Sequence, residues 1–240
     1  MSEPQRPVRV LIHGATGRMG QALLRLAGEG ADGESEVVAA VSRNPGQRVV
    51  DGVPQFAARE LAGVPEFDVA IDFSLPQAFD AILGSCLARG AALVSGTTGL
   101  ESPQLEALHE ASARIPVLYA ANFSLGVAVL GDLVERAAAV LRGWDCDIVE
   151  SHHVHKKDAP SGTALALGVC AEQGGARPRY AALRAGDIVG EHMVQFTGLG
   201  ERVELVHRAG NRDIFARGAL HAAARLAGRE PGRYQLRDLL

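Results

Sequence analysis

The stretch Val8-Arg-Val-Leu-Ile-His-Gly-Ala-Thr-Gly-Arg-Met-Gly20 joins a short apolar run to a glycine-rich turn. The run Val8 to His13 favours a buried strand, and helical periodicity follows from Gln21 to Ala27. The glycines are spaced G-x-x-G-x-x-G, which differs by one position from the commonest dinucleotide loop, G-x-G-x-x-G. Glycines allow the backbone to approach a pyrophosphate at the N-terminus of the following helix. We therefore expect a nucleotide here, the alternative being a tight turn without a ligand.

The same alternation of strand and helix continues through the first half of the chain. Apolar runs at 37–41, 69–73, 92–95 and 117–120 predict strands, and the segments 77–88 and 103–113 predict helices between them. Short apolar runs separated by helices are typical of a parallel sheet covered on both faces. The sequence therefore predicts an α/β fold with a Rossmann-like parallel sheet.

The composition limits the classes of protein. The chain has 240 residues, of which 47% are hydrophobic and 22% charged, as in an ordinary globular protein. A net charge of −4 gives no reason to expect nucleic acid or a membrane surface as a partner. No apolar run approaches the ~20 residues that span a bilayer, and the N-terminal residues lack the pattern of a signal peptide. Cys86, Cys146 and Cys170 are scattered, as expected of buried thiols in a cytoplasmic protein without a disulfide frame.

The end of the second strand bears on the choice of cofactor. An NAD site usually has an acid there to bind the ribose hydroxyls, but this chain reads Ala40-Val-Ser-Arg-Asn44. The permanently charged fork of Arg43 suits a 2′-phosphate. We therefore expect NADPH to be preferred over NADH, the alternative being that Arg43 is only a surface charge.

Three later strand ends carry small polar loops, at 72–74, 95–99 and 120–124. In open parallel sheets, ligands lie outside the carboxyl ends of the strands, so these loops are candidates to contact a nicotinamide and its ribose. Each could instead be a plain turn or a helix cap.

The second half has a different pattern. A helix is expected at 131–142, and strands at 145–151, 181–185, 192–197, 201–209 and 214–215. Such a block predicts an α+β substrate domain with a mainly antiparallel or mixed sheet, and a last helix near 218–227 is expected to return to the nucleotide domain.

Titratable residues are concentrated in one segment of this half, Glu150-Ser-His-His-Val-His-Lys-Lys-Asp-Ala-Pro-Ser-Gly-Thr-Ala164. A metal site is one interpretation, because His153 and His155 have a suitable spacing with Glu150 nearby. However, no further ligand lies at a familiar spacing, and the adjoining lysines would repel a cation. We expect no metal. A solvated loop without a role is a second interpretation.

The third interpretation is an acid–base site that binds an anion. Ser161 is a candidate cap for a helix over 162–168, whose first amides at Gly162 and Thr163 can hold a carboxylate. Histidines and lysines beside them supply positive charge and transferable protons. Crowding of cations is expected to lower their pKa values and so to bring a lysine closer to useful acidity. We favour this interpretation.

The segment 150–164 is similar to the signature of the dihydrodipicolinate reductase family. The resemblance covers nearly the whole chain and includes the segments 14–19, 96–99, 120–124, 185–192 and 212–218. It implies an enzyme of lysine and diaminopimelate synthesis that reduces 4-hydroxy-tetrahydrodipicolinate, a cyclic imine dicarboxylate, with NADPH or NADH. In the family, water is lost from ring C4 and hydride reaches C4.

The resemblance also implies roles for individual residues. His152 would be the proton donor and acceptor, Lys156 a proton donor and His153 a substrate contact, with Gly162 and Thr163 binding a substrate carboxylate. The cofactor would be bound by Gly14, Ala15, Thr16, Gly17, Arg18, Met19, Ser42, Arg43, Gly96, Thr97, Thr98, Ala120, Ala121, Asn122 and Phe123. Many members have an acid where this chain has Ser42, which agrees with the expected NADPH preference. No role is settled for His155, Lys157 or Arg212.

The expected domains are 1–123 with 213–240 for the cofactor, and 124–212 for the substrate and for assembly, with closure about a hinge near Ser124 and Arg212. The resemblance implies a homotetramer, although the segment 171–180 is shorter here than in longer members. Two alternatives stay open. One is an NADPH-dependent oxidoreductase of the same architecture acting on another imine or carbonyl acid, and the other is a dinucleotide-binding sensor without turnover.

Overall fold

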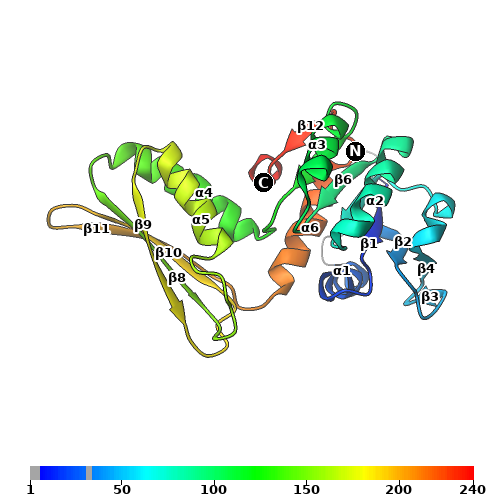
Figure 1. Cartoon of the computed structure of the whole chain (residues 1–240), viewed down its shortest axis with the longest axis horizontal. Coiled ribbons are helices and arrows are strands. Elements are labelled where there is room, and N and C mark those ends of the chain that lie inside the picture. The colour runs from blue at the N-terminus through cyan, green and yellow to red at the C-terminus, as the bar shows by residue number, and fades with distance from the viewer. Residues whose placement is uncertain (1–5, 31–33) are drawn as a thin grey trace, which may run out of the picture. The chain divides into compact units, whose positions relative to one another are not determined.

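The computed structural model describes residues 6–30 and 34–240 (Figure 1). The chain forms two compact units, one comprising the chain up to Phe123 together with Phe215–Leu240, and the other Ser124–Ile214. Residues 1–5 and 31–33, which belong to the cofactor domain expected from the sequence, lie outside the described residues.

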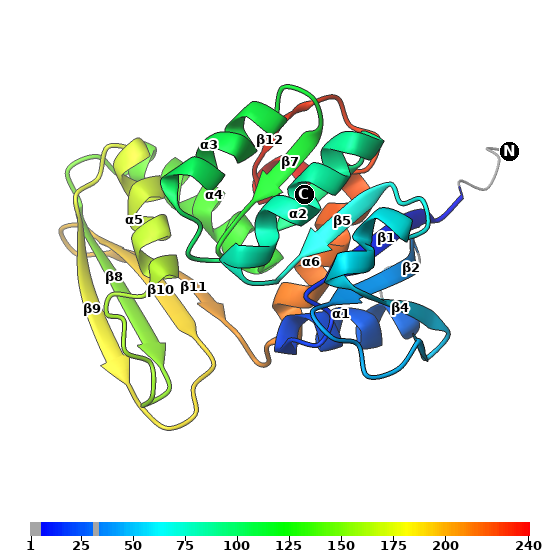
Figure 2. The same ribbon diagram turned by 45° about the vertical axis from the view of Figure 1, so that its right-hand side comes forward.

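The first unit is built on an eight-stranded sheet with the strand order β12-β7-β6-β5-β1-β2-β4-β3. Its strands are β1 (Val8–His13), β2 (Ser35–Ser42), β3 (Val49–Val50), β4 (Val53–Ala57), β5 (Val69–Asp72), β6 (Ala92–Ser95), β7 (Pro116–Tyr119) and β12 (Gly232–Tyr234). All neighbouring strands are parallel except β3 and β4. Figure 2 shows β5, β1, β2 and β4 side by side. The order on either side of β1 is that of a doubly wound sheet, so the predicted Rossmann-like fold is confirmed.

Helices cover both faces of this sheet. They are α1 (Arg18–Gly28), α2 (Pro76–Arg89), α3 (Ser102–Ala111) and α6 (Asp213–Leu226), with short 3₁₀ segments at Ala58–Gly63 and Leu236–Leu239. Alternate strand residues such as Leu11, Ala70 and Leu93 pack in one apolar cluster with residues of α2 and α3. In Figure 1, α1 and α6 lie on the opposite side of the sheet from α2 and α3. Every residue of β5 and β6 is buried, because both faces are covered.

The second unit has a four-stranded sheet in the order β11-β10-β8-β9, with one face packed on two helices. The strands are β8 (Asp145–His152), β9 (Pro178–Arg184), β10 (Glu191–Thr197) and β11 (Arg202–Arg208), and the helices are α4 (Leu125–Val140) and α5 (Gly162–Gln173). β8 pairs in parallel with β9 and antiparallel with β10. The sheet is therefore mixed, which was one of the two expected forms.

Three predicted elements were wrong in type or extent. Residues 214–215 are not a strand, because they lie in the first turn of α6, which begins at Asp213 and not near Gly218. The amide of Asp213 donates to Oδ1 of Asn211 at 3.0 Å, and this contact fixes the start of the helix. The helix expected from Gly131 begins at Leu125, because the hydroxyl of Ser124 caps it by accepting from the amide of Val127.

Candidate active site

The loops predicted to bind the cofactor leave the first sheet at one edge. In the parallel register, His13 is paired with Val41 and Asp72, Asp72 with Ser95, and Ser95 with Tyr119. The predicted residues of segments 14–19, 42–43, 96–98 and 120–123 lie at these strand ends, in the loops that follow or in the first residues of the next helix. The structure thus brings together all the residues predicted for the cofactor at the carboxyl ends of the strands, where doubly wound sheets bind ligands.

The glycine loop is closely packed against the backbone of the neighbouring strand end. Gly14 has a φ of +82°, and a Cβ there would collide with the carbonyl of Phe73. The amide of Gly17 donates to the carbonyl of Gly14 at 2.9 Å, and Gly17 is the N-cap of α1. The first amides of α1 have no acceptor within the helix, so they are suited to an anion such as a pyrophosphate.

A buried polar cluster, which was not predicted as a unit, lies at the same edge. Asp72 is fully buried, and its carboxylate contacts Nδ1 of His13 at 2.8 Å and accepts from the hydroxyls of Ser95 and Thr97 at 2.9 and 2.8 Å. Burial raises the pKa of Asp72, but the hydrogen bonds from His13, Ser74 and Thr97 outweigh it, so that the pKa lies below its usual range. The cluster ties together the ends of β1, β5 and β6.

The end of β2 combines a buried hydroxyl with an exposed cation. Ser42 is buried and its Oγ has no hydrogen-bond partner among the described residues, whereas Arg43 is exposed. The residues directly after Arg43 line a pocket of about 190 Å³, whose lining includes Asn44, Arg48 and Arg59. A buried hydroxyl without a described partner, next to an exposed guanidinium, fits a ribose with an attached phosphate.

In the second unit, strand alternation places Glu150 and His152 on the inner face of β8. The buried residues of this strand are Cys146, Ile148, Glu150 and His152, at every second position. On this face of β8, Cys146 and Ile148 are apolar and pack on α4 and α5, whereas Glu150 and His152 at the end of the strand are ionisable. On β10, His192 is paired with Glu150 and is also buried.

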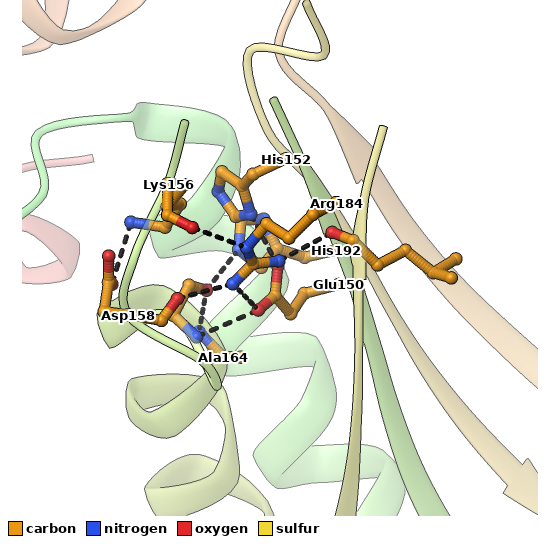
Figure 3. A network of polar contacts seen from close by, with 9 residues as sticks. Glu150, His152, Lys156, Asp158, Ala164, Arg184 and His192 are labelled. Carbon is orange, nitrogen blue, oxygen red and sulfur yellow. Dashed lines mark hydrogen bonds and ion pairs between the residues drawn. The ribbon is translucent and has the colours of Figure 1, made fainter. Parts of the chain in front are cut away.

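Glu150 is the centre of a polar network (Figure 3). Its carboxylate accepts from two nitrogens of Arg184, each at 2.8 Å, and from the amide of Ser161 at 3.1 Å. It also contacts Nδ1 of His152 at 2.5 Å. Burial raises the pKa of Glu150, but the hydrogen bonds from Arg184 and His152 lower it by more. The net pKa therefore lies below its usual value, which favours the ionised carboxylate.

The loop after β8 carries the predicted proton donor. Nζ of Lys156 forms an ion pair with Oδ2 of Asp158 at 2.8 Å, and the amide of Lys156 donates to the carbonyl of His153 at 3.1 Å. Nδ1 of His153 is buried without a partner among the described residues. Burial is the largest cause that lowers the pKa of His153, and the nearby charges of Arg212 and His155 lower this pKa further, which is the direction expected from crowded cations. The ring of His155 lies 6.2 Å from that of His153.

The predicted helix cap at Ser161 is confirmed. Its hydroxyl accepts from the amide of Ala164 at 3.2 Å, so α5 begins at Gly162, and the first turn contains both predicted carboxylate-binding amides, of Gly162 and Thr163. The same hydroxyl lies 3.1 Å from Nε2 of His192. Burial, and next the charge of His152, lowers the pKa of His192 to about 4, so this ring is neutral near pH 7.

Sequence reasoning missed Arg184 and His192 as members of this site. Arg184 directly precedes the segment 185–192 that resembles the family, and His192 is its last residue, but both lie far in sequence from the cluster of titratable residues at 150–164. Within the described residues, no group of three or more His, Cys, Asp or Glu side chains is placed to hold a metal ion.

Family models match both units of the chain. The model described as "Dihydrodipicolinate reductase, N-terminus" matches residues 8–123, and the model of the C-terminus matches residues 126–240. The chain belongs to the dihydrodipicolinate reductase family. The resemblance stated from the sequence is thereby confirmed.

Individual relatives agree with this membership. The chain is 70% identical over 236 residues to 4-hydroxy-tetrahydrodipicolinate reductase of Stenotrophomonas maltophilia (strain R551-3), covering 98% of this chain and 99% of the relative. It is 69% identical over 234 residues to the protein of the same name from Xanthomonas campestris pv. campestris (strain B100), covering 98% of each. The solved structure of a dipicolinate-bound dihydrodipicolinate reductase from Paenisporosarcina sp. TG-14 has a TM-score of 0.81 at 22% identity, covering 98% of this chain and all of that one. The family's N-terminal domain implies a pyridine nucleotide as the cofactor. Within residues 6–30 and 34–240 of this chain, no helix is both long enough and apolar enough to cross a membrane.

Proposed function

We propose that the chain reduces 4-hydroxy-tetrahydrodipicolinate to tetrahydrodipicolinate in lysine and diaminopimelate synthesis, with a reduced pyridine nucleotide as the hydride donor. Family membership over both units and 70% identity to a relative of that name support this function. The observation that carries the proposal is the cluster of His152, His153 and Lys156 at the end of β8, next to the start of α5. Such a cluster suits an anionic substrate that exchanges protons with the protein.

The carboxyl edge of the first sheet fits the cofactor. The close approach at Gly14, which a Cβ would fill, and the unpartnered hydroxyl of Ser42 are the two observations that support the fit. We assign the pyrophosphate to segment 14–19, the adenosine ribose to Ser42 and Arg43, and the nicotinamide ribose to segments 96–98 and 120–123. When bound, the reduced nicotinamide supplies the hydride.

We also propose that NADPH is preferred over NADH. No acid stands at Ser42 or Arg43 to accept hydrogen bonds from free ribose hydroxyls. Arg43 is exposed at the end of β2, and the neighbouring pocket has two further arginines in its lining, although Arg48 is paired with Glu60 at 3.1 Å. A 2′-phosphate offers the acceptors that such guanidinium groups bind best.

On the substrate side, His152 gives and takes protons, Lys156 donates one, and His153 contacts the substrate. The unpartnered Nδ1 of His153 and the pKa of this residue, lowered chiefly by burial, suit a neutral ring that bonds to a polar ligand atom. The amides of Gly162 and Thr163 bind one substrate carboxylate, since an α-helix has no acceptor of its own for its first amides.

The two units divide these tasks in our proposal. Residues 1–123 and 213–240 bind the cofactor, and residues 124–212 bind the substrate and form the contacts of a homotetramer. Exposed apolar side chains on β9 and β11 support an assembly role for the second unit, namely Leu183, Val203 and Val206, with exposed fractions of 57%, 38% and 40%.

The function is tested by following NADPH absorbance with the condensation product of pyruvate and aspartate semialdehyde as substrate. We expect oxidation of NADPH that depends on this substrate, and slower oxidation of NADH at equal concentration. No oxidation with either cofactor refutes the function, and oxidation only with other imine or carbonyl acids favours the alternative reductase.

A further inference from the structure

Glu150 is wholly buried, yet it is ionised and fully bonded. Arg184, the amide of Ser161 and Nδ1 of His152 occupy its two oxygens at distances from 2.5 to 3.1 Å. Burying such a group is costly, and replacing a buried ion pair by apolar side chains is often neutral or stabilising. Stability alone therefore gives little reason for a carboxylate at this place, where β8 passes from apolar residues to His152.

The contact with Glu150 fixes the chemical state of one ring nitrogen of His152. An ionised carboxylate is only an acceptor, so Nδ1 of His152 must carry a proton. Among the described residues, Nε2 has no hydrogen-bond partner. It faces the backbone of Gly190, where a Cβ would lie 3.0 Å from Nε2. The lone pair of Nε2 is thus left for a ligand, and the glycine opposite leaves room for it.

We propose that Glu150 is a positioning residue that makes Nε2 of His152 the atom of proton transfer, and that Arg184 holds Glu150 in place. This inference deepens the proposed function and rests on the role given there to His152. When the neutral ring takes a proton from the substrate at Nε2, it becomes an imidazolium that still donates from Nδ1 to Glu150. Return of the same proton to the substrate restores the neutral ring, and the carboxylate never takes the proton up.

Arg184 connects this arrangement to the second proton donor. Besides binding both oxygens of Glu150, its Nε donates to the carbonyl of Lys156 at 3.2 Å, and its Nη2 donates to the carbonyl of Asp158. One planar guanidinium therefore fixes the carboxylate behind His152 and the loop that carries Lys156. The single ammonium of a lysine cannot make all these contacts in one plane.

The direct test is the tautomer of His152, read from ¹⁵N NMR of the full chain labelled in its histidine rings. In the wild-type chain we expect the neutral ring to be protonated at Nδ1. In Glu150→Gln, Nη2 of Arg184 and the amide of Ser161 keep the amide oxygen, at the position of Oε1, as their acceptor. The NH₂ group then takes the position of Oε2, where it loses the bond from Nη1 of Arg184 and donates to Nδ1 of His152, which forces the proton of the ring onto Nε2. A wild-type ring protonated at Nε2, or an unchanged tautomer in Glu150→Gln, overturns the proposal.

Kinetics give the second readout. We expect the turnover of Glu150→Gln to fall by about 10²–10⁴-fold, the range for a general acid–base, with KM for the substrate changed much less. The matched control is Glu191→Gln on β10, which removes the charge of a partly exposed acid paired with Arg208 and leaves turnover within about twofold. Turnover of Glu150→Gln within tenfold of wild type contradicts the proposal.

A variant at Gly190 keeps the test decisive if Glu150→Gln does not fold. Gly190→Ala leaves the contact between Glu150 and His152 intact but places a methyl group against Nε2. We expect an unchanged tautomer together with a loss of turnover of at least tenfold, and full turnover would exclude Nε2 as the reacting atom. Failure of the proposed function has a different outcome, because the wild-type chain would then oxidise no NADPH with the substrate while the tautomer remained measurable.

Discussion

Nδ1 of His13 lies 2.8 Å from Oδ1 of Asp72, in the buried cluster where β1 and β5 end. The hydroxyls of Ser95 and Thr97 donate to the other oxygen of the same carboxylate. This one side chain therefore connects the strand ends from which three cofactor loops leave. The relationship links the stability of the first unit to the geometry of the cofactor loops.

Asp72→Asn is expected to lower the free energy of unfolding by about 1–3 kcal/mol, because the amide offers one acceptor oxygen and places a donor against existing donors. Urea denaturation at pH 7 measures the change. Glu110→Gln, on the exposed side of α3, is the control and should stay within about 0.5 kcal/mol of wild type. If Asp72→Asn also stayed within about 0.5 kcal/mol of the wild-type free energy of unfolding, the cluster would contribute nothing to stability.

The same pair predicts a dependence on pH. The pKa of Asp72 in the folded chain is below its usual value, despite burial, because of the hydrogen bonds from His13, Ser74 and Thr97. A lowered carboxyl pKa gives stability that is fully present above the unfolded pKa, about 4, and is lost as the pH falls through the folded pKa. The difference in stability between wild type and Asp72→Asn should therefore shrink below about pH 4, and a constant difference down to acid unfolding would contradict the assignment.

Gly14→Ala separates two requirements at the glycine loop. The substitution introduces a residue at a φ of +82° and also a Cβ that collides with the carbonyl of Phe73. Gly90→Ala is the matched control, since Gly90 has a φ of +64° and open space around its Cβ position. We expect the control to cost about 1 kcal/mol, and Gly14→Ala to cost more and to weaken NADPH binding at least tenfold. Calorimetric titration with NADPH gives the affinity, and equal behaviour of the two variants would exclude the close approach as the cause.

Whether a strand could be predicted from the sequence depended on how completely it is buried. Strands such as β5 and β6 are buried on both faces and read as continuous apolar runs, so they were predicted closely. β3 and β4 were missed because Gly52 and Pro54 interrupt their segment, and β12 because its three residues, Gly-Arg-Tyr, are not apolar. In these cases pairing with neighbouring strands decides the conformation.

The candidate site divides in the same way. The cluster around His152 is contiguous in sequence, so its chemistry could be inferred from the residues and from the family resemblance. Arg184 lies 34 positions from Glu150, and Asp72 lies 59 from His13, so only the strand pairing reveals these contacts. Residue type predicted which groups can react, while the fold supplied the groups that hold them.

Lys156→Ala is expected to reduce turnover by about 10²–10⁴-fold, because the proposed proton donor is lost while the fold of β8 is not touched. Lys157→Ala, which removes the neighbouring exposed lysine, is the control and should keep turnover within about twofold. Steady-state rates with NADPH at saturation measure both. A Lys156→Ala chain that keeps more than about a tenth of the wild-type rate would falsify the role of Lys156.

His192 predicts a second window of pH sensitivity. Its pKa is lowered to about 4 by burial and by the nearby His152, against about 6.5 in the unfolded chain. Between these values only the unfolded chain takes up the proton, so stability is full above pH 6.5 and falls toward pH 4, by about 3 kcal/mol in total. His192→Gln should remove this slope in urea denaturation between pH 7 and 4.5. His109→Gln, at an exposed position of α3, should keep it, and equal slopes in wild type and His192→Gln would refute the assignment.

Arg43→Ala tests the choice of cofactor. If Arg43 binds the 2′-phosphate, its removal deletes charge-assisted hydrogen bonds worth about 1.5–3 kcal/mol, so KM for NADPH should rise by about 10–100-fold. KM for NADH is the internal control, because NADH lacks that phosphate and should change by less than about threefold. The effect on NADPH should also weaken as salt is raised, since Arg43 is exposed and its attraction to phosphate is screened. A parallel rise for both cofactors would mean that Arg43 contacts the shared part of the dinucleotide, and no change for either would leave it as a surface charge.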